Sequence, residues 1–242
     1  MAKFGRVAEM GIFRATKTFF RDSEAHVAQA AEPKVLKTSI PRKYKRELTL
    51  AGAPGREAME TIDKHGVNTV FRDGGGSMYD RAKNTIYIDV KNGSPTAGLV
   101  HEATHARWTR EGWTADVSRL DRTSFVNRSL DEETDAAVNE IRTITELRKQ
   151  GIEVPDSALQ SHYTYGYNNA VQWSDATARA QGRPLTYAEL DQAGQLGGRG
   201  AVSAAYHSGQ IRGSVDGTPY PQHLGAGWDS YQAWYRQYGQ QI

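Results

Sequence analysis

The sequence predicts an α+β fold that is mostly helical, with a small antiparallel sheet ahead of a central helix. Two short stretches, "VNTVFR" and "NTIYIDV", are rich in β-branched and aromatic residues, and the loop "DGGGS" separates them. Helix-start signals or helical periodicity mark most of the chain that follows. At 242 residues, the chain is long enough to bury a sizeable core, and no internal repeat divides it.

The segment 1–50 is basic and weakly periodic, and it includes the cluster "PRKYKR" at 41–46. Such a cluster is either a solvated connector or a patch for acidic partners. We expect residues 1–50 to pack on the rest of the protein or to act as a connector. We expect residues 51–242 to form one domain.

Four elements are expected between residues 54 and 111. "PGREAMETIDKHG" predicts a helix closed by Gly66, and the two strands follow it. Ser94 can cap the next helix, and Pro95 occupies its first position, where the missing N–H costs nothing. This helix is expected over 95–111. The strand "TIYIDV" just before it is a candidate edge strand for aligning an extended ligand.

The remaining elements are predicted to be helices. The segment 129–151, "SLDEETDAAVNEIRTITELRKQG", begins with Ser129 and Glu132 in the arrangement of a capping box. Shorter helices are expected near 166–181, 187–196 and 229–238. The last of these is expected to dock on the body rather than to serve as a nucleic-acid platform, because it has aromatic residues at helical spacing: Trp228, Tyr231, Trp234, Tyr235 and Tyr238.

The composition excludes several functional classes. Lys plus Arg number 30 and Asp plus Glu 28, so a net charge of +2 gives no electrostatic case for nucleic acid. The chain has no cysteine, so any metal must be held by histidine and carboxylate side chains. We find no run of about 18 apolar residues, and therefore expect no membrane span. Arg14 and Lys17 interrupt the N-terminal apolar residues, so no signal peptide is expected. We expect synthesis in the cytoplasm, with any export depending on a dedicated secretion system.

The stretch "HEATH" carries the main chemical signal. His101 and His105 lie one helical turn apart, so both imidazoles project from one face and can reach a single ion. Glu102 lies about 100° round the helix from His101, close enough to act on a bound water. This is the H-E-x-x-H arrangement of zinc metalloproteases. There Zn²⁺ lowers the pKa of its water towards 7 and polarises a peptide carbonyl, while the glutamate moves the proton.

Catalytic zinc usually takes three protein ligands, and the predicted helix 129–151 offers the third. Glu133 points with the apolar stripe of that helix, whereas Glu132 points away from it. Glu140 is the other acid on the stripe, about 10.5 Å further along the axis, so one ion can take only one of the two. We choose Glu133 as the ligand.

Two alternatives to this choice stay open. Glu140 is either the ligand in place of Glu133 or a partner to an imidazole N–H. The other interpretation of Glu133 is a salt bridge to an arginine such as Arg107 or Arg110.

With these residues the chain resembles a known family. His-Glu-x-x-His followed by "ETDA" at 133–136 and "ELRKQG" is similar to gluzincin-type metallopeptidases. It resembles in particular the small metallopeptidase domains that form toxin tails in bacteria, including those attached to type VI secretion spikes and Rhs proteins. The resemblance covers residues 85–151. The chain departs from larger gluzincins at Ala137, where they have an aspartate, which leaves the orientation of His101 unexplained.

The resemblance implies zinc-dependent hydrolysis of a protein or peptide substrate, with residues 51–242 as the metallopeptidase domain. It also implies, less directly, a toxin or effector role with an immunity or delivery protein as partner. The alternative class is a non-catalytic metal-binding or structural module. Glu102 separates the two classes, because a structural metal site has no need of a base beside the metal. Further candidate donors to an oxyanion are His162, Tyr163 and Tyr165, unless this cluster is half-buried packing. His207 and His223 could also reach a site from the C-terminal region.

Overall fold

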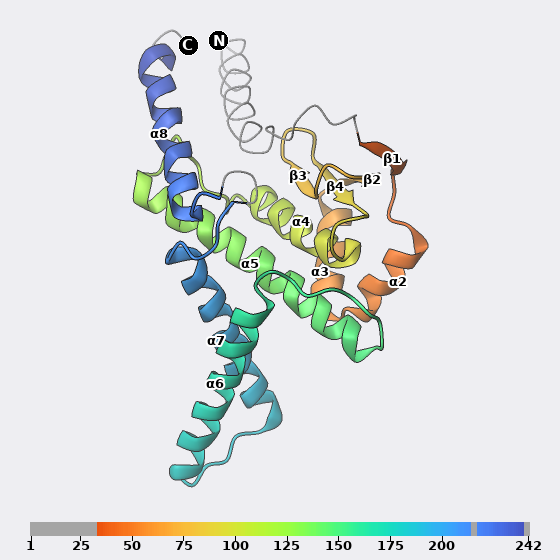
Figure 1. Cartoon of the computed structure of the whole chain (residues 1–242), viewed down its shortest axis with the longest axis vertical. Helices are drawn as coiled ribbons and strands as arrows, with labels where there is room; N and C mark the ends of the chain where they lie inside the picture. Colours follow the sequence, from red (N-terminus) through yellow and green to blue (C-terminus); the bar gives the residue numbers. More distant parts are fainter. Residues whose placement is uncertain (1–32, 214–216, 240–242) are drawn as a thin grey trace.

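The computed structural model describes residues 33–213 and 217–239 (Figure 1). This part of the chain contains seven helices and a four-stranded sheet, so the predicted α+β class is confirmed. The helices are α2 (Arg42–Leu50), α3 (Ala53–Lys64), α4 (Pro95–Arg110), α5 (Arg122–Lys149), α6 (Gln160–Ala180), α7 (Tyr187–His207) and α8 (Tyr220–Tyr238). None of these helices is long and apolar enough to cross a bilayer.

The sheet is mixed rather than wholly antiparallel. Its strands are β1 (Lys34–Lys37), β2 (Asn68–Asp73), β3 (Met78–Asp80) and β4 (Thr85–Asp89), in the order β1-β2-β4-β3. The pair β2–β4 is parallel, and the two outer pairs are antiparallel. The three-residue strand β3 was not predicted from the sequence. It pairs antiparallel with β4, so that β4 lies between β2 and β3.

This topology corrects the predicted edge strand. β4, the "TIYID" strand, pairs on both sides, so it has no free edge. The edge beside the helix that follows is β3, which contacts α4 directly. The edge position that was predicted for β4 is therefore occupied by β3.

Helix α5 begins earlier than predicted. Asp121 caps it by accepting a hydrogen bond from the Ser124 N–H at 3.0 Å. Ser129 lies two turns inside the helix, and its hydroxyl donates to the Phe125 carbonyl at 2.9 Å. The predicted capping box of Ser129 and Glu132 is therefore wrong, because the helix had already been started by an aspartate outside the apolar pattern.

Two separate apolar cores lie on opposite sides of the α4–α5 contact. The first joins the sheet to α2, α3 and α4, and its most buried members include Leu48, Phe71, Ile86, Ile88 and Leu99. The second joins α5 to α6, α7 and α8, with Leu130, Ile141, Val202 and Tyr206 among its members. Figure 1 shows α5 crossing the molecule between these two groups of elements. The seam between α4 and α5 is the position of the candidate site.

Residues 33–50 form β1 and α2. They are the described part of segment 1–50, which was predicted to pack on the domain or to act as a connector. Leu48 on α2 is fully buried in the first core, and Glu47 accepts a hydrogen bond from the Thr96 hydroxyl on α4. Residues 1–32 lie outside the described residues.

Helices α6 and α7 form an arm, residues 160–207, that extends from the body (Figure 1). The helices approach closely because glycines face each other: a Cβ built on Gly197 would lie 2.5 Å from the Gly166 carbonyl oxygen. On the other side of the body, α8 docks on α5 through its aromatic face, as predicted. Tyr231 is buried there, and the Trp228 indole N–H donates to the Leu120 carbonyl at 3.0 Å.

Candidate metal centre

Helix α4 presents both histidines towards α5. Ser94 caps α4 by accepting from the Ala97 N–H at 3.3 Å, and Pro95 follows at the first helical position. His101 and His105 are one turn apart, and their Nε2 atoms face each other at 3.2 Å. Two nitrogens bound to one tetrahedral zinc at about 2.0–2.1 Å lie roughly 3.3 Å apart. The separation of the imidazoles therefore matches that of two ligands of a single ion.

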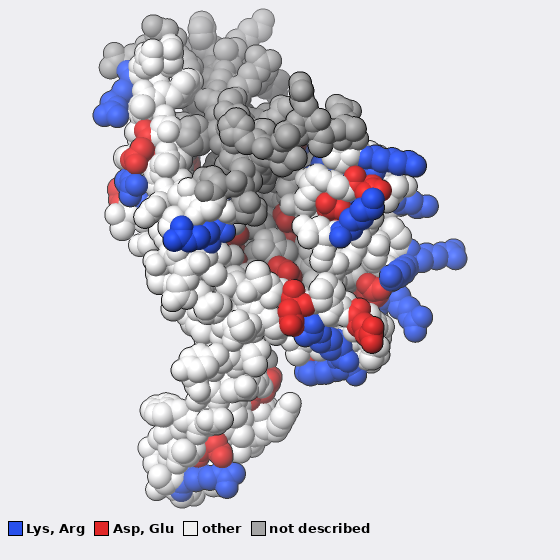
Figure 2. All heavy atoms as spheres, in the orientation of Figure 1, with Lys and Arg blue, Asp and Glu red and all other residues white. Residues whose placement is uncertain are grey.

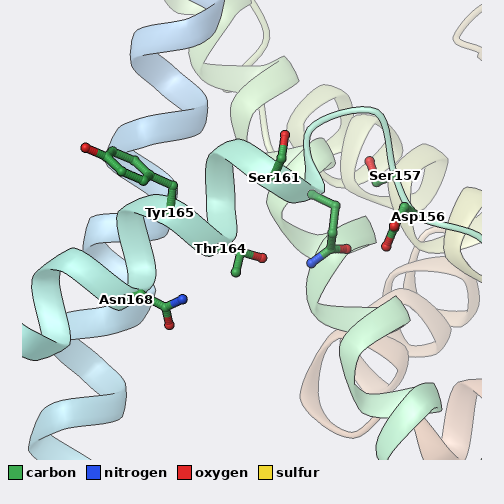
Figure 3. A pocket seen from close by; sticks show the side chains of 7 residues that line it. Asp156, Ser157, Ser161, Thr164, Tyr165 and Asn168 are labelled. Carbon is green, nitrogen blue, oxygen red and sulfur yellow. The ribbon is translucent and has the colours of Figure 1, made fainter.

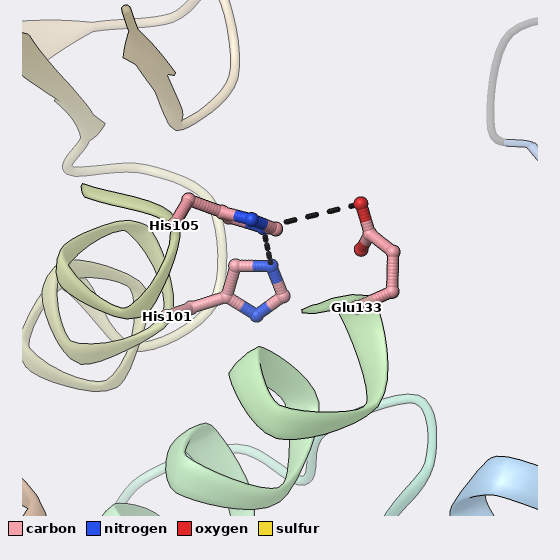
Figure 4. Close-up of side chains that lie close together, drawn as sticks. All are labelled: His101, His105 and Glu133. Atoms are coloured by element: carbon pink, nitrogen blue, oxygen red, sulfur yellow. Dashed lines mark hydrogen bonds and ion pairs between the residues drawn. The ribbon is translucent and has the colours of Figure 1, made fainter. Parts of the chain in front are cut away.

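Glu133 on α5 completes the group. Its Oε1 lies 3.9 Å from His105 Nε2, and one donor atom from each of the three residues lies within 4.8 Å of the others. Figure 4 shows the carboxylate directed across the seam to the paired imidazoles. The three predicted ligands are thus brought together, with nitrogen and oxygen donors in the set that zinc takes in catalytic sites.

The far nitrogen of each imidazole is held by a second carboxylate of α5. His101 Nδ1 lies 3.0 Å from Glu140 Oε2, and His105 Nδ1 lies 2.9 Å from Glu132 Oε1. Since an ionised carboxylate only accepts hydrogen bonds, each Nδ1 must carry its proton. In a neutral imidazole this leaves the Nε2 lone pair free for a metal.

Of the two roles left open for Glu140, the structure places it as the partner of an imidazole N–H. Glu140 also accounts for the orientation of His101, which the absence of an aspartate at Ala137 had left unexplained. Arg107, one of the arginines considered as a partner for Glu133, pairs instead with Glu57 at 3.1 Å.

The prediction that Glu132 points away from the buried face is wrong. Its side chain is only 4% exposed, and it contacts both His105 and the Arg81 guanidinium, the latter at 2.9 Å. Helix α5 packs against α4 on one side and against α7 and α8 on another, so its buried surface is wider than one apolar stripe. The pattern of apolar residues could not predict the burial of Glu132, because Glu132 is buried against the polar side chains of His105 and Arg81.

The charges around this network set the pKa of Glu132. Burial alone would raise it, but hydrogen bonds from His105 and Thr114 and the positive charges of Arg81 and His105 outweigh burial and hold it below its ordinary range. Glu132 is therefore ionised at neutral pH and can serve as the acceptor for the Nδ1–H of His105.

The metal-free histidines are surrounded by negative charge. Burial lowers the pKa of His101, but the hydrogen bond to Glu140 and the charges of Glu102, Glu140 and Glu133 raise it to about 9. The pKa of His105 is raised in the same way, against burial, by the charges of Glu133 and Glu132 and by its hydrogen bond to Glu132. A site with this much negative charge and two adjacent nitrogen donors is suited to a cation.

Glu102 lies beside the two histidines. Its side chain is buried, and burial raises its pKa, although the charges of His101 and His105 and a backbone hydrogen bond from Tyr79 act in the opposite direction. Tyr79 belongs to the edge strand β3. Glu102 therefore contacts both the histidine pair and β3, which is an edge strand in the described part of the chain.

The tyrosine that lies near the candidate ligands is Tyr206, which the sequence did not suggest as a site residue. Tyr163 is buried in the second core, and Tyr165 is 70% exposed on the arm. Tyr206 on α7 is buried, and burial followed by the charge of Glu133 raises its pKa, with Glu140 acting in the same direction. Tyr206 is therefore close enough to both carboxylates for their charges to affect it. No local signal in "AAYHSG" distinguishes it from a core tyrosine.

Comparisons of the chain with models of protein families, with curated proteins and with solved structures give no match. The resemblance to gluzincin-type metallopeptidases stays a prediction from the motifs.

Proposed function

We propose that the protein is a zinc-dependent metallopeptidase with His101, His105 and Glu133 as metal ligands. The observation that carries the proposal is the convergence of two imidazole Nε2 atoms and one carboxylate, with each Nδ1 held by a further carboxylate. Zinc is favoured over softer or harder metals because the donor set is two nitrogens and one carboxylate, without thiolate.

Bound zinc supplies a water of pKa near 7 and a positive charge beside the carbonyl to be attacked. The chain's own residues hold the geometry. Glu140 and Glu132 fix the two imidazole rings, and Arg81 holds Glu132 in place. This arrangement limits how far the ligands must reorganise when charge develops during the reaction.

Glu102 is the general base in this proposal. It takes a proton from the attacking water and delivers it to the leaving amine as the peptide bond breaks. The substrate lies in an extended conformation along the outer edge of β3, which pairs on that side with no other strand among the described residues. Tyr79 connects the two, because it belongs to that edge and its backbone N–H contacts Glu102.

The alternative function is a non-catalytic metal-binding or structural module. A structural zinc site commonly has four protein ligands and no open position. Here the described residues supply three, and a buried carboxylate that is not one of them stands beside the site. These two features favour catalysis.

The test begins with metal content and turnover. Purified protein should contain about one zinc per chain by elemental analysis, since one ligand triad is proposed, and it should cleave an unfolded substrate such as casein. A chelator should abolish cleavage, and added zinc should restore it. Protein that binds no zinc, or zinc-loaded protein that leaves every unfolded substrate intact, would contradict the proposal.

Glu102→Gln separates chemistry from metal binding. Zinc content and thermal stability should stay near wild type, while turnover falls about 10²–10⁴-fold because the general base is lost. Undiminished proteolysis would overturn the mechanism and leave the module as the better account.

The resemblance to bacterial toxin tails extends the proposal to an effector role. Expression of the wild-type chain in a bacterial host, in the cytoplasm and separately in the periplasm, should then arrest growth in one compartment. Glu102→Gln should be harmless there. Growth unaffected in both compartments would remove the effector role while leaving the peptidase proposal to the biochemical test.

A further inference from the structure

A hollow on the arm is separate from the candidate metal centre. It has a volume of about 610 Å³ and is lined by Asp156, Ser157, Gln160, Ser161, Thr164, Tyr165 and Asn168 (Figure 3). The loop before α6 forms one part of its wall, and one face of the first half of α6 forms the rest. None of the metal ligands or their carboxylate partners lines it.

The lining has an unusual chemistry because it is polar without being charged. It offers four hydroxyls and two side-chain amides, each of which can both donate and accept hydrogen bonds. The single charged member, Asp156, is already paired with Arg148 at 2.6 Å. From residue 157 to residue 174 the sequence has no Lys, Arg, Asp or Glu. Apart from the Asp156–Arg148 pair, the lining offers no charged group to an ionic ligand.

The polar groups of this hollow are available for a ligand. Within the described ranges, the side chains of Ser161, Thr164 and Asn168 have no hydrogen-bond partner in the protein, and all three are exposed. Gln160 Oε1 is buried without a donor, which is unfavourable in a folded protein.

An aromatic ring extends the surface beyond the hollow. Tyr165 is 70% exposed at its rim, and Trp173 is 72% exposed two turns further along α6. At about 1.5 Å and 100° per residue, Trp173 lies about 12 Å further along the axis and about 80° round the helix from Tyr165, so it projects away from the side of Thr164 that lines the hollow. Asn169 and Gln172 lie exposed between them. Figure 2 shows that the charged side chains on the visible face of the arm gather in its outer part.

We propose that this face of α6 binds a neutral glycan, with one sugar residue in the hollow and a further sugar stacked on Tyr165. A pyranose ring has a C–H face that stacks on the electron-rich face of an aromatic ring. Its hydroxyls both donate and accept, as do the side chains of the hollow. An apolar ligand would leave those polar groups unpaired, and a charged ligand would lack a counterion. The inference goes beyond the proposed peptidase function and does not depend on it.

The test uses neutral oligosaccharides as probes. Chitotetraose, cellotetraose and maltotetraose are titrated into the full chain, with binding followed by calorimetry and by the fluorescence of tryptophan. At least one probe should bind saturably. Tyr165→Ala should weaken its affinity about tenfold or more, in line with the loss of one stacking contact. Trp173→Ala should leave the affinity near wild type, because Trp173 projects from another side of α6 than the hollow.

Tyr235→Ala is the matched control, because Tyr235 is a 49% exposed tyrosine on α8, away from the arm. It should bind the probe as wild type does. Failure of all three probes to bind, or wild-type affinity in Tyr165→Ala, would overturn the proposal. So would tighter binding of an acidic polysaccharide such as heparin.

The glycan and peptidase proposals can fail separately. Probe affinity should be the same in Glu102→Gln and in the presence of a chelator, and cleavage of casein by Tyr165→Ala should match wild type. A glycan affinity that required zinc would contradict the assignment of binding to the arm.

Discussion

At the scale of single residues, the candidate site depends on which carboxylate meets which atom. Glu132, Glu133 and Glu140 lie on one helix and all approach the histidine pair, but only Glu133 is directed at the Nε2 side. The other two hold Nδ1 atoms. Substitution of Glu133 should therefore reduce zinc affinity more than substitution of Glu132 or Glu140.

Glu133→Ala should nearly abolish zinc binding at micromolar zinc, because a ligand is lost. Glu132→Gln and Glu140→Gln keep the shape but remove the charge that orients the imidazoles, and each should weaken binding by about 10–100-fold. Competition with a chromophoric chelator measures the three affinities.

Glu153→Gln, an exposed acid in the loop after α5, should bind zinc as wild type does. Normal binding by Glu133→Ala together with loss of binding by Glu140→Gln would show that the ligand has been assigned to the wrong residue.

At the scale of secondary-structure elements, the end of β4 is tied to the glycine loop by one carboxylate. Asp89 accepts backbone N–H groups from Gly74, Gly76 and Lys91 at 3.0–3.1 Å. Burial would raise the pKa of Asp89, but these hydrogen bonds and the charge of Arg72 lower it. The ionised form is thus preferred in the folded protein.

Asp89→Asn should lower the free energy of unfolding at pH 7 by about 1–3 kcal/mol, because bonds to a charged acceptor are lost. The folded pKa lies below the unfolded value of about 3.9, so the stabilisation is complete above that pH and is lost as the pH falls through the folded pKa. The difference between variant and wild type should therefore shrink below about pH 4. Urea unfolding at several pH values measures it.

Asp63→Asn, at an exposed acid near the end of α3, should leave the free energy of unfolding at pH 7 close to that of wild type. If the difference in free energy of unfolding between wild type and Asp89→Asn stays constant down to pH 2, the loss of stability comes from altered packing and not from the lost charge.

The arm depends on the close approach of α6 and α7. A Cβ on Gly197 would lie 2.3 Å from the Ala170 Cβ and 2.5 Å from a backbone oxygen of α6, so Gly197→Ala should destabilise by roughly 1–3 kcal/mol. Gly200, one turn later on α7, has nothing within 4 Å of that position. Gly200→Ala should stabilise by up to about 1 kcal/mol through helix propensity. Thermal unfolding of both variants measures the difference in stability between them. Equal unfolding temperatures would show that α6 and α7 do not approach closely at Gly197.

At the scale of the whole molecule, the candidate ligands lie at the α4–α5 contact, with one apolar core on each side of it. Two ligands belong to α4 and one to α5. An ion that binds only the folded protein stabilises it by about 2.7 kcal/mol at a free concentration of 100 times its Kd. We therefore expect chelation to lower the unfolding temperature of wild type. It should have no effect on His101→Ala, as calorimetry with and without zinc would measure. An unfolding temperature indifferent to zinc in wild type would contradict a metal at the seam.

Much of this architecture could be predicted from local pattern. The caps of α4, the spacing of His101 and His105, and the apolar face with Glu133 are all local features, and the structure agrees with each. The roles of Glu132 and Tyr206 could not be predicted, because both depend on how α5 packs against elements distant in sequence. The short strand β3 was missed for a related reason: three residues carry too little pattern, and pairing with β4 is what defines the strand.

The seam has a consequence for how the chain could be divided. The connection from Glu111 to Asp121 is the covalent link between α4 and α5, and each side of it retains an apolar core of its own. A break after Gly112 would leave two fragments that split the ligand set two to one. Reassembly of such fragments would then respond to metal concentration, so the protein would act as a two-part sensor whose halves recognise each other through an ion.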